Sequence, residues 1–268
     1  MTRSAAAVKD RQFVTALSRG LVILGCFDAT RPELSGSQIA KITGLPQPTV
    51  WRLCHTMLSM GVLVSVAGDR LRPGLPALRL GYSVLANLSI TEAARPHMQA
   101  LADRFGAACG IGARDGLDVV FVQRCESDSQ LLMNLRVGSR VPLGSSALGW
   151  AWLAGLRPAE RDATIAAVAR AQPERWAEVK RDFAKALAEY EGKGFITNVG
   201  VFHKGYNTAA VPILAADGSV AYALNCGSAA STLPPAKLRM EVAPALVNLA
   251  GLLQSALQAG APLPPRIG

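Results

Sequence analysis

The spacing of apolar residues predicts two helices in the first 44 residues. The first carries its apolar side chains at three- and four-residue steps, which is typical of an amphipathic helix, and it ends in the loop 28–32. Its apolar positions are Phe13, Leu17, Leu21, Leu24 and Phe27. A second, shorter helix is predicted around Ile39, Ala40 and Ile42. We expect Ser37 to cap the start of this helix and Gly44 to end it.

A third helix is predicted after the turn Leu45-Pro46-Gln47. Pro48 fits its first position, because the residue there needs no amide hydrogen. One face is apolar and comprises Val50, Leu53, Cys54 and Met57. The outward face is polar and basic and comprises Pro48, Arg52, His55 and Ser59, with Thr49 and Trp51 on its flanks. Helices joined by a tight turn that contains glycine form the helix-turn-helix pattern.

A two-stranded hairpin is predicted directly after the third helix. Residues 61–66 are mostly apolar, residues 67–69 form a turn, and Arg70 to Arg72 precede Pro73. A helix-turn-helix with such a hairpin is a winged helix-turn-helix. The segment 74–90 then reads as a further amphipathic helix, a linker that could also form a dimer contact.

The remaining chain mixes helices and strands and is predicted to be an α+β domain. We expect helices at 91–105, from about 145, at 175–191 and at 235–257, and strands at 109–113, 117–122, 131–137, 195–197, 208–213 and 220–226. Asp115-Gly116 between the first two strands is a strong hairpin signal.

Charge distinguishes the two parts of the chain. The net charge is +9, from 28 Lys and Arg against 19 Asp and Glu. Residues 1–80 hold 10 of those basic residues and 4 of the acidic ones, so the N-terminal third carries +6. This part is therefore the one expected to meet a polyanion, although a solvated basic surface is the alternative.

Targeting and disulfide signals are weak in the sequence. The start of the chain returns to charge before an apolar segment of signal-peptide length forms, and no 18 consecutive residues are all apolar. The five cysteines are odd in number and never spaced C-x-x-C, which favours buried, reduced thiols. We therefore expect a cytoplasmic protein that does not interact with membranes.

The outward face of the third helix and the hairpin together predict a DNA-binding surface. A helix in the major groove would place Arg52 and Thr49 against base edges or phosphates, while Arg70 and Arg72 would meet the adjacent backbone or minor groove. The expected DNA-binding set is Gln47, Pro48, Thr49, Trp51, Arg52, His55, Arg70 and Arg72. Helix-turn-helix units also serve as protein-docking modules, so a scaffold remains an alternative.

Signals for an enzyme are weak. The segment Gly144-Ser145-Ser146-Ala147-Leu148-Gly149 misses the G-x-S-x-G pattern by one residue, because Leu148 stands where the second glycine belongs. Only three histidines are present, and neither a P-loop nor a cluster of metal ligands is found. We expect no catalytic residues, metal or cofactor, and an enzyme with an accessory helix-turn-helix is kept as an alternative.

Motifs along most of the chain resemble the IclR family of bacterial transcriptional regulators. They lie in order over residues 13–257 and include Gly44-Leu45-Pro46-Gln47-Pro48-Thr49-Val50, Leu135-Arg136-Val137-Gly138-Ser139-Arg140-Val141-Pro142 and Ala209-Ala210-Val211-Pro212-Ile213. The opening segment, residues 13–21, is most similar to the branch that regulates aromatic-acid catabolism.

The resemblance implies a regulator that binds a palindromic operator as a homodimer or homotetramer. The implied domains are a flexible N-terminus (1–12), a winged helix-turn-helix (13–73), a linker helix (74–90), a GAF-like effector-binding domain (91–260) and a tail (261–268). The implied effector is a small organic acid, which could be aromatic.

The family's effector contacts carry over by position. Backbone amides of Ala147 and Leu148 would receive a carboxylate at a helix N-terminus. The remaining contacts would fall at Asn198, Thr208, Leu224 and Cys226. Asn198 replaces an acidic residue, and Leu224 and Cys226 replace hydroxyl residues, so we expect a more apolar pocket that could receive a ring. The alternative is that Leu224 and Cys226 are ordinary strand core.

Overall fold

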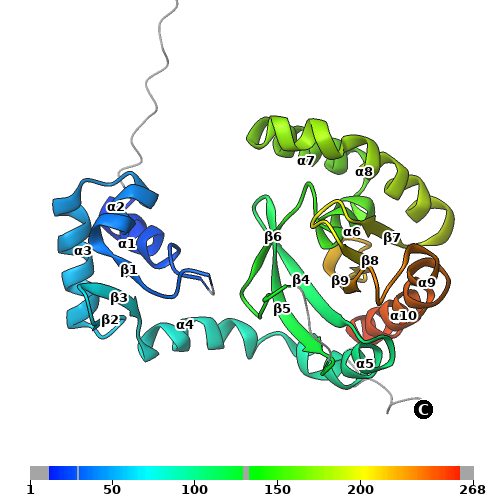
Figure 1. Ribbon diagram of the computed structural model, residues 1–268, viewed down its shortest axis with the longest axis horizontal. Coiled ribbons are helices and arrows are strands. Elements are labelled where there is room, and N and C mark those ends of the chain that lie inside the picture. The colour runs from blue at the N-terminus through cyan, green and yellow to red at the C-terminus, as the bar shows by residue number, and fades with distance from the viewer. Residues whose placement is uncertain (1–11, 29, 129–132, 260–268) are drawn as a thin grey trace, which may run out of the picture. The chain divides into compact units, whose positions relative to one another are not determined.

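The protein consists of two compact units that divide between Ala86 and Asn87 (Figure 1). A computed structural model describes residues 12–28, 30–128 and 133–259. The segments predicted as a flexible N-terminus and a tail lie almost entirely outside these residues. Each unit has its own core and is described separately.

The N-terminal unit is a winged helix-turn-helix. Its elements are α1 (Thr15–Leu24), β1 (Leu34–Ser35), α2 (Gly36–Thr43), α3 (Gln47–Ser59), β2 (Leu63–Val66), β3 (Arg70–Pro73) and α4 (Leu75–Leu85). The three strands form an antiparallel sheet in the order β1-β3-β2. Buried residues from all three first helices and from the wing make one core, which includes Ile23, Ile39, Val50, Met57 and Leu63.

The buried face of α1 differs from the predicted one. Ile23 is the buried residue of this helix, whereas Phe13, Leu17 and Leu21 are more than half exposed. The apolar stripe seen in the sequence is real, but most of it does not face the core of its own unit.

The N-terminal ends of α2 and α3 also differ from the prediction. Ser35, not Ser37, caps α2: its Oγ accepts a hydrogen bond from the Gln38 amide at 3.2 Å, and Gln38 Oε1 accepts one from the Ser35 amide at 2.8 Å. This reciprocal pair is a capping box, which satisfies two backbone donors at once. Helix α3 begins at Gln47, so Pro48 occupies its second position.

The predicted linker helix 74–90 is interrupted. Helix α4 ends at Leu85, and α5 (Ser89–Phe105) begins after Leu88, whose backbone is not helical, at φ −98° and ψ 78°. The carbonyl of Leu88 accepts hydrogen bonds from both the amide and the hydroxyl of Thr91, which starts the new helix. No residue of α4 is buried.

The C-terminal unit is built on a six-stranded antiparallel sheet in the order β6-β5-β4-β9-β8-β7. The strands are β4 (Ala108–Asp115), β5 (Asp118–Glu126), β6 (Arg140–Pro142), β7 (Ile196–Val199), β8 (Tyr206–Leu214) and β9 (Val220–Ala229). The α+β class is confirmed. The strand predicted at 131–137 is wrong for residues 133–137, which are irregular; residues 131 and 132 lie outside the described chain.

Helices cover both faces of this sheet. One face packs against α6 (Ala147–Gly155), with α7 (Pro158–Ala171) and α8 (Pro173–Lys193) outside it. The other face carries α5 and the closing helical stretch, α9 (Pro235–Lys237), a π-turn (Leu238–Val242) and α10 (Ala243–Ala259). Helix α7 was not predicted, and α6 has nine residues rather than the long run expected.

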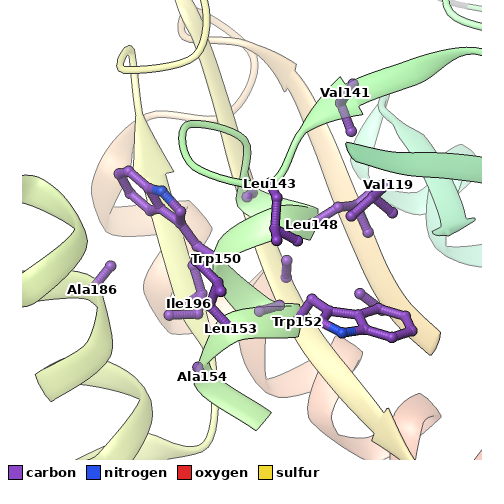
Figure 2. Close-up of a cluster of buried hydrophobic side chains, with 14 of the residues drawn as sticks. Val119, Val141, Leu143, Leu148, Trp150, Trp152, Leu153, Ala154, Ala186 and Ile196 are labelled. Carbon is purple, nitrogen blue, oxygen red and sulfur yellow. The ribbon is translucent and has the colours of Figure 1, made fainter. Parts of the chain in front are cut away.

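Helix α6 is buried on nearly every side. Trp150 is 1% exposed, and its Nε1 donates a hydrogen bond to the Gly144 carbonyl at 2.8 Å. Figure 2 shows Trp150 and Trp152 leaving α6 in opposite directions, with Leu148 and Leu153 among the other core side chains. The core therefore fixes the position of α6 and of the backbone amides at its N-terminus.

One helical stretch, Pro235–Ala259, is long and apolar enough by composition to cross a membrane. Its apolar side chains are used inside this unit instead, because Leu246, Leu249 and Leu253 of α10 are buried and α10 packs on β8.

Candidate DNA-binding and effector sites

The outward face of α3 is exposed along its whole length. Gln47, Pro48, Arg52 and His55 are exposed, Thr49 is half-buried, and the side chain of Trp51 is 67% exposed. The opposite face is held in the core by Val50, Cys54 and Met57. Because the core of the N-terminal unit holds the opposite face of α3, the exposed Trp51 indole is available for contact with a partner.

A groove of about 700 Å³ lies between α3, the start of α2 and the wing. Its walls include Ser37, Trp51, His55 and Asp69. The rings of Trp51 and His55, one helical turn apart, lie 5.5 Å from centroid to centroid. The groove thus joins the helix and the wing into one continuous surface.

The wing carries its two arginines on one side of β3. Arg70 and Arg72 are exposed on either side of the buried Leu71, and they pair with Val66 and Val64 of β2. Arg70 Nη2 also donates a hydrogen bond to the carbonyl of Glu33, the residue before β1, at 2.9 Å, so part of its bonding capacity is used within the unit.

In the C-terminal unit, the start of α6 lies beside Asn198 of β7. Ala147 and Leu148 are 4% and 1% exposed, and Ser146 caps the helix by accepting a hydrogen bond from the Gly149 amide at 3.0 Å. Asn198 Nδ2 donates to the Ser145 carbonyl at 3.0 Å. The structure therefore brings these sequence-predicted positions together.

Thr208 shares a face of the sheet with Asn198. The two residues are paired across β7 and β8, and Thr208 is also paired with Gly227 of β9. Paired residues of neighbouring strands point to the same side. Both side chains are buried and lie on the α6 side of the sheet.

Leu224 and Cys226 lie on the opposite side of the sheet from Asn198 and Thr208. The prediction that all four side chains line one pocket is therefore wrong. Leu224 and Cys226 alternate with Asn225 and Gly227 along β9, and Cys226 is paired with Ala209 and Cys109 on the side covered by α5 and α10. A shift of one residue in a strand moves a side chain to the other face. The β9 residues that join Asn198 and Thr208 are Asn225 and Gly227, which the sequence analysis missed.

A buried arginine on the α6 side was also missed. The side chain of Arg124 is 4% exposed, its Nε donates to Glu126 Oε1 at 2.7 Å, and its guanidinium lies 5.3 Å from the centre of the Phe121 ring. Glu126 also accepts two hydrogen bonds from Arg136 Nη1, at 2.9 and 3.0 Å. One carboxylate is therefore shared between two guanidinium groups.

Tyr206 closes this polar region. Its phenol is buried, which raises its pKa to about 12, although nearby Arg124 acts in the opposite direction. The ring crosses Gly227, with Cε1 2.8 Å from the position that a Cβ at this glycine would take. A side chain at 227 would displace the ring, so glycine permits this close approach of the tyrosine.

Three thiols occupy one row on the other face. Cys109 is paired with both Cys125 and Cys226, and all three are buried. A hydrogen bond with Cys226, together with burial, raises the pKa of the Cys109 thiol, which keeps it protonated and unreactive. Among the residues that the structure describes, no group of three or more His, Cys, Asp or Glu could hold a metal ion.

These features define a protein with a winged helix-turn-helix unit, whose α3 face is exposed, and a separate α+β unit. Comparison with known families agrees: residues 16–67 match the IclR helix-turn-helix domain, and residues 82–251 match the bacterial transcriptional regulator IclR C-terminal domain. The chain belongs to the IclR family of bacterial transcriptional regulators. It is a regulator rather than an enzyme.

Individual relatives are similar along nearly the whole chain. The HTH-type transcriptional regulator TsaQ1/TsaQ2 of Comamonas testosteroni is 32% identical over 253 residues, covering 93% of this chain and 90% of that protein. The p-hydroxybenzoate hydroxylase transcriptional activator of Acinetobacter baylyi is 25% identical over 265 residues, covering 94% and 95%. The crystal structure of an IclR family regulator from Brucella abortus is 36% identical, with a TM-score of 0.82 over 95% of this chain and 96% of that one.

Proposed function

We propose that this regulator reads a palindromic operator through α3 and the wing, and that a small organic acid held in the C-terminal unit controls its DNA binding. The observation that carries the DNA-binding part is the exposed face of α3, with Arg52 and the 67% exposed Trp51 above a buried core. The protein acts in the cytoplasm, where it meets the chromosome.

Each predicted DNA contact has a distinct task in this proposal. Thr49 and Arg52 meet base edges in the major groove, where arginine binds guanine in a two-pronged fashion. Gln47, Pro48, Trp51 and His55 extend the contact along the groove. Arg72 meets the phosphate backbone beside the wing, and Arg70 combines that role with its hydrogen bond to the Glu33 carbonyl.

The test is fluorescence anisotropy with DNA from upstream of the protein's own gene and with unrelated DNA, over a range of salt concentrations. We expect tight binding to the upstream DNA that weakens steeply with salt. Arg52→Ala should cost about 1–3 kcal/mol at the upstream site. Arg181→Ala, which removes an exposed charge from α8, is the matched control and should leave the affinity unchanged. Equal affinities for the two variants would contradict the assigned role of α3.

A second copy of the chain is the proposed partner of α1 and α4. Leu17 and Leu21 on α1 and Leu78 and Tyr82 on α4 are more than half exposed. An eleven-residue helix with no buried residue is marginal by itself in water, so α4 needs a surface to pack on. A homodimer supplies that surface and matches the two halves of a palindrome; a homotetramer would be a pair of such dimers.

The effector is proposed to bind on the α6 side of the sheet. Its carboxylate meets the amides of Ala147 and Leu148 at the N-terminus of α6, and Asn198 and Thr208 lie on the same side of the sheet. The chain is similar to a p-hydroxybenzoate hydroxylase transcriptional activator, which supports an aromatic acid as the effector. The test is to titrate organic acids calorimetrically into the protein and to repeat the anisotropy assay with each acid that binds. The proposal requires one acid that does both: binds the protein and changes its operator affinity.

A further inference from the structure

Trp51 lies largely outside the core of the N-terminal unit. Its side chain is 67% exposed, whereas Val50, Cys54 and Met57 on the other side of α3 are buried. A single exposed apolar side chain is ordinary, but this indole borders a groove with further apolar lining. Tryptophan is also enriched among the residues that dominate binding interfaces. The packing of α3 does not need the indole at this position, so a partner outside the unit is its expected contact.

The place of Trp51 on α3 suits contact with the edges of bases. It is the fifth of thirteen residues in this helix, in the half of a recognition helix that contacts base edges. His55 follows one turn later, and its ring lies 5.5 Å from the indole, centroid to centroid, at an angle of 31°. A neighbouring ring restricts the rotamers of the indole, which lowers the entropy lost on binding.

The lining of the groove beside Trp51 favours an apolar group over a phosphate. Val50, Leu58 and Leu71 contribute apolar surface to it. Among the residues that the structure describes, the lining includes Asp69 but neither lysine nor arginine. A phosphate group in this groove would be repelled by the Asp69 carboxylate and would meet no cationic side chain. An uncharged part of the DNA is therefore the better occupant.

The major groove of DNA offers one apolar group on its base edges, the 5-methyl group of thymine. The other groups at these edges are hydrogen-bond donors and acceptors, which lose their bonds to water when an apolar ring covers them. An indole in the major groove thus favours thymine and disfavours the other bases. Trp51 and Arg52 are one helical rise of 1.5 Å apart, so the bases that they contact lie within about two base pairs of each other.

We propose that Trp51 is a specificity-determining residue, whose indole packs against the 5-methyl group of one thymine in each half of the operator. His55 acts as a positioning residue that supports the ring. This inference rests on the proposed DNA-binding function and adds the identity of one base to it.

The first test selects binding sites from a random duplex library, in parallel for the wild type, Trp51→Ala and Met60→Ala. Met60 is 66% exposed directly after α3 and lies outside the predicted DNA-binding set, so it provides the matched control. The wild type and Met60→Ala should both select one thymine in each half-site, close to the base that Arg52 contacts. Trp51→Ala should lose the preference at this position alone.

The second test removes only the methyl group, by placing deoxyuridine at the selected thymine and measuring the affinity by fluorescence anisotropy. The wild type should bind about fourfold more weakly for each methyl group removed, and about 15-fold more weakly when both half-sites are changed. Trp51→Ala should bind the thymine and deoxyuridine duplexes equally well, and Trp51→Phe should retain part of the difference. The readout is the ratio of the two affinities, which a general loss of DNA binding does not change.

The outcomes separate this inference from the broader proposal. The inference is overturned, and the proposed DNA binding stands, if the wild type and Trp51→Ala select the same sequences or if the wild type binds both duplexes equally. Equal weakening of Trp51→Ala on every sequence would place the indole on the DNA backbone, and a shift toward the monomer in sedimentation would place it in the dimer interface. Either result overturns the inference. A library from which the wild type enriches no sequence would overturn both the inference and the proposed operator binding.

Discussion

The buried phenol of Tyr206 makes the stability of the C-terminal unit sensitive to alkaline pH. Burial raises its pKa to about 12 in the folded protein, against 10.0 for an ordinary tyrosine. Between these values the unfolded chain loses the proton while the folded one retains it, so stability falls as pH rises. Two pKa units correspond to about 2–3 kcal/mol, fully present below pH 10 and lost above pH 12.

Tyr206→Phe should therefore reduce the loss of unfolding free energy between pH 9 and pH 11. Urea denaturation of the wild type and the variant across this range measures the difference. Tyr82→Phe, at an exposed tyrosine of α4, is the control and should leave the pH profile unchanged. Identical profiles for the wild type and Tyr206→Phe would mean that burial does not raise the pKa of this phenol.

Side-chain direction in β9 determines which of its residues face the proposed effector region. The sequence resemblance placed two of the proposed effector contacts on β9, and the structure has the other four, Ala147, Leu148, Asn198 and Thr208, together on the α6 side of the sheet. It chose Leu224 and Cys226 instead of Asn225 and Gly227, because a strand shifted by one residue looks equally regular along the sequence. The polar-apolar alternation Leu224-Asn225-Cys226 was the available signal.

At the scale of elements, the capping box of α2 fixes the helix that precedes the DNA-reading helix. Ser35→Ala removes the acceptor for the Gln38 amide and should lower the unfolding free energy of the N-terminal unit by about 1 kcal/mol. Hydrogen exchange of the α2 backbone amides in increasing urea suits this test, because Trp150 and Trp152 of the C-terminal unit would also contribute to a tryptophan fluorescence signal. Ser37→Ala, at the residue first predicted as the cap, should change it by much less. A larger effect of Ser37→Ala would contradict the observed cap.

Elements with a clear one-sided pattern were the predictable ones. The third helix and the wing were predicted to within two residues, since turns and apolar periodicity agree there. Helix α7 was missed because only Thr164 and Val168 of its fourteen residues are buried, which leaves little periodic signal. Helix α6 has the opposite problem: eight of its nine residues are buried, so its pattern is apolar all round.

At the scale of the whole molecule, charge and exposed apolar surface are concentrated in the same unit. Residues 1–80 carry +6 of the total +9, which suits a polyanion. The same unit exposes large apolar side chains on α1 and α4 that its own core does not use, among them Leu17, Leu21 and Tyr82. Basic and apolar surfaces in one small unit are explained together if two copies of this unit bind one DNA duplex.

Disrupting the apolar surface of α1 should therefore weaken both assembly and DNA binding. Leu17→Glu with Leu21→Glu places two charges on a surface that the proposed dimer would bury, while Ile23 and the core remain intact. Sedimentation at micromolar concentration should show a shift toward the monomer. Operator affinity should fall by at least about tenfold, because the second half-site no longer binds as an intramolecular step. Met240→Glu, at a 78% exposed methionine of the C-terminal unit, is the matched control. A double variant that sediments and binds the operator like this control would exclude α1 from the interface and leave α4 as the surface to test next.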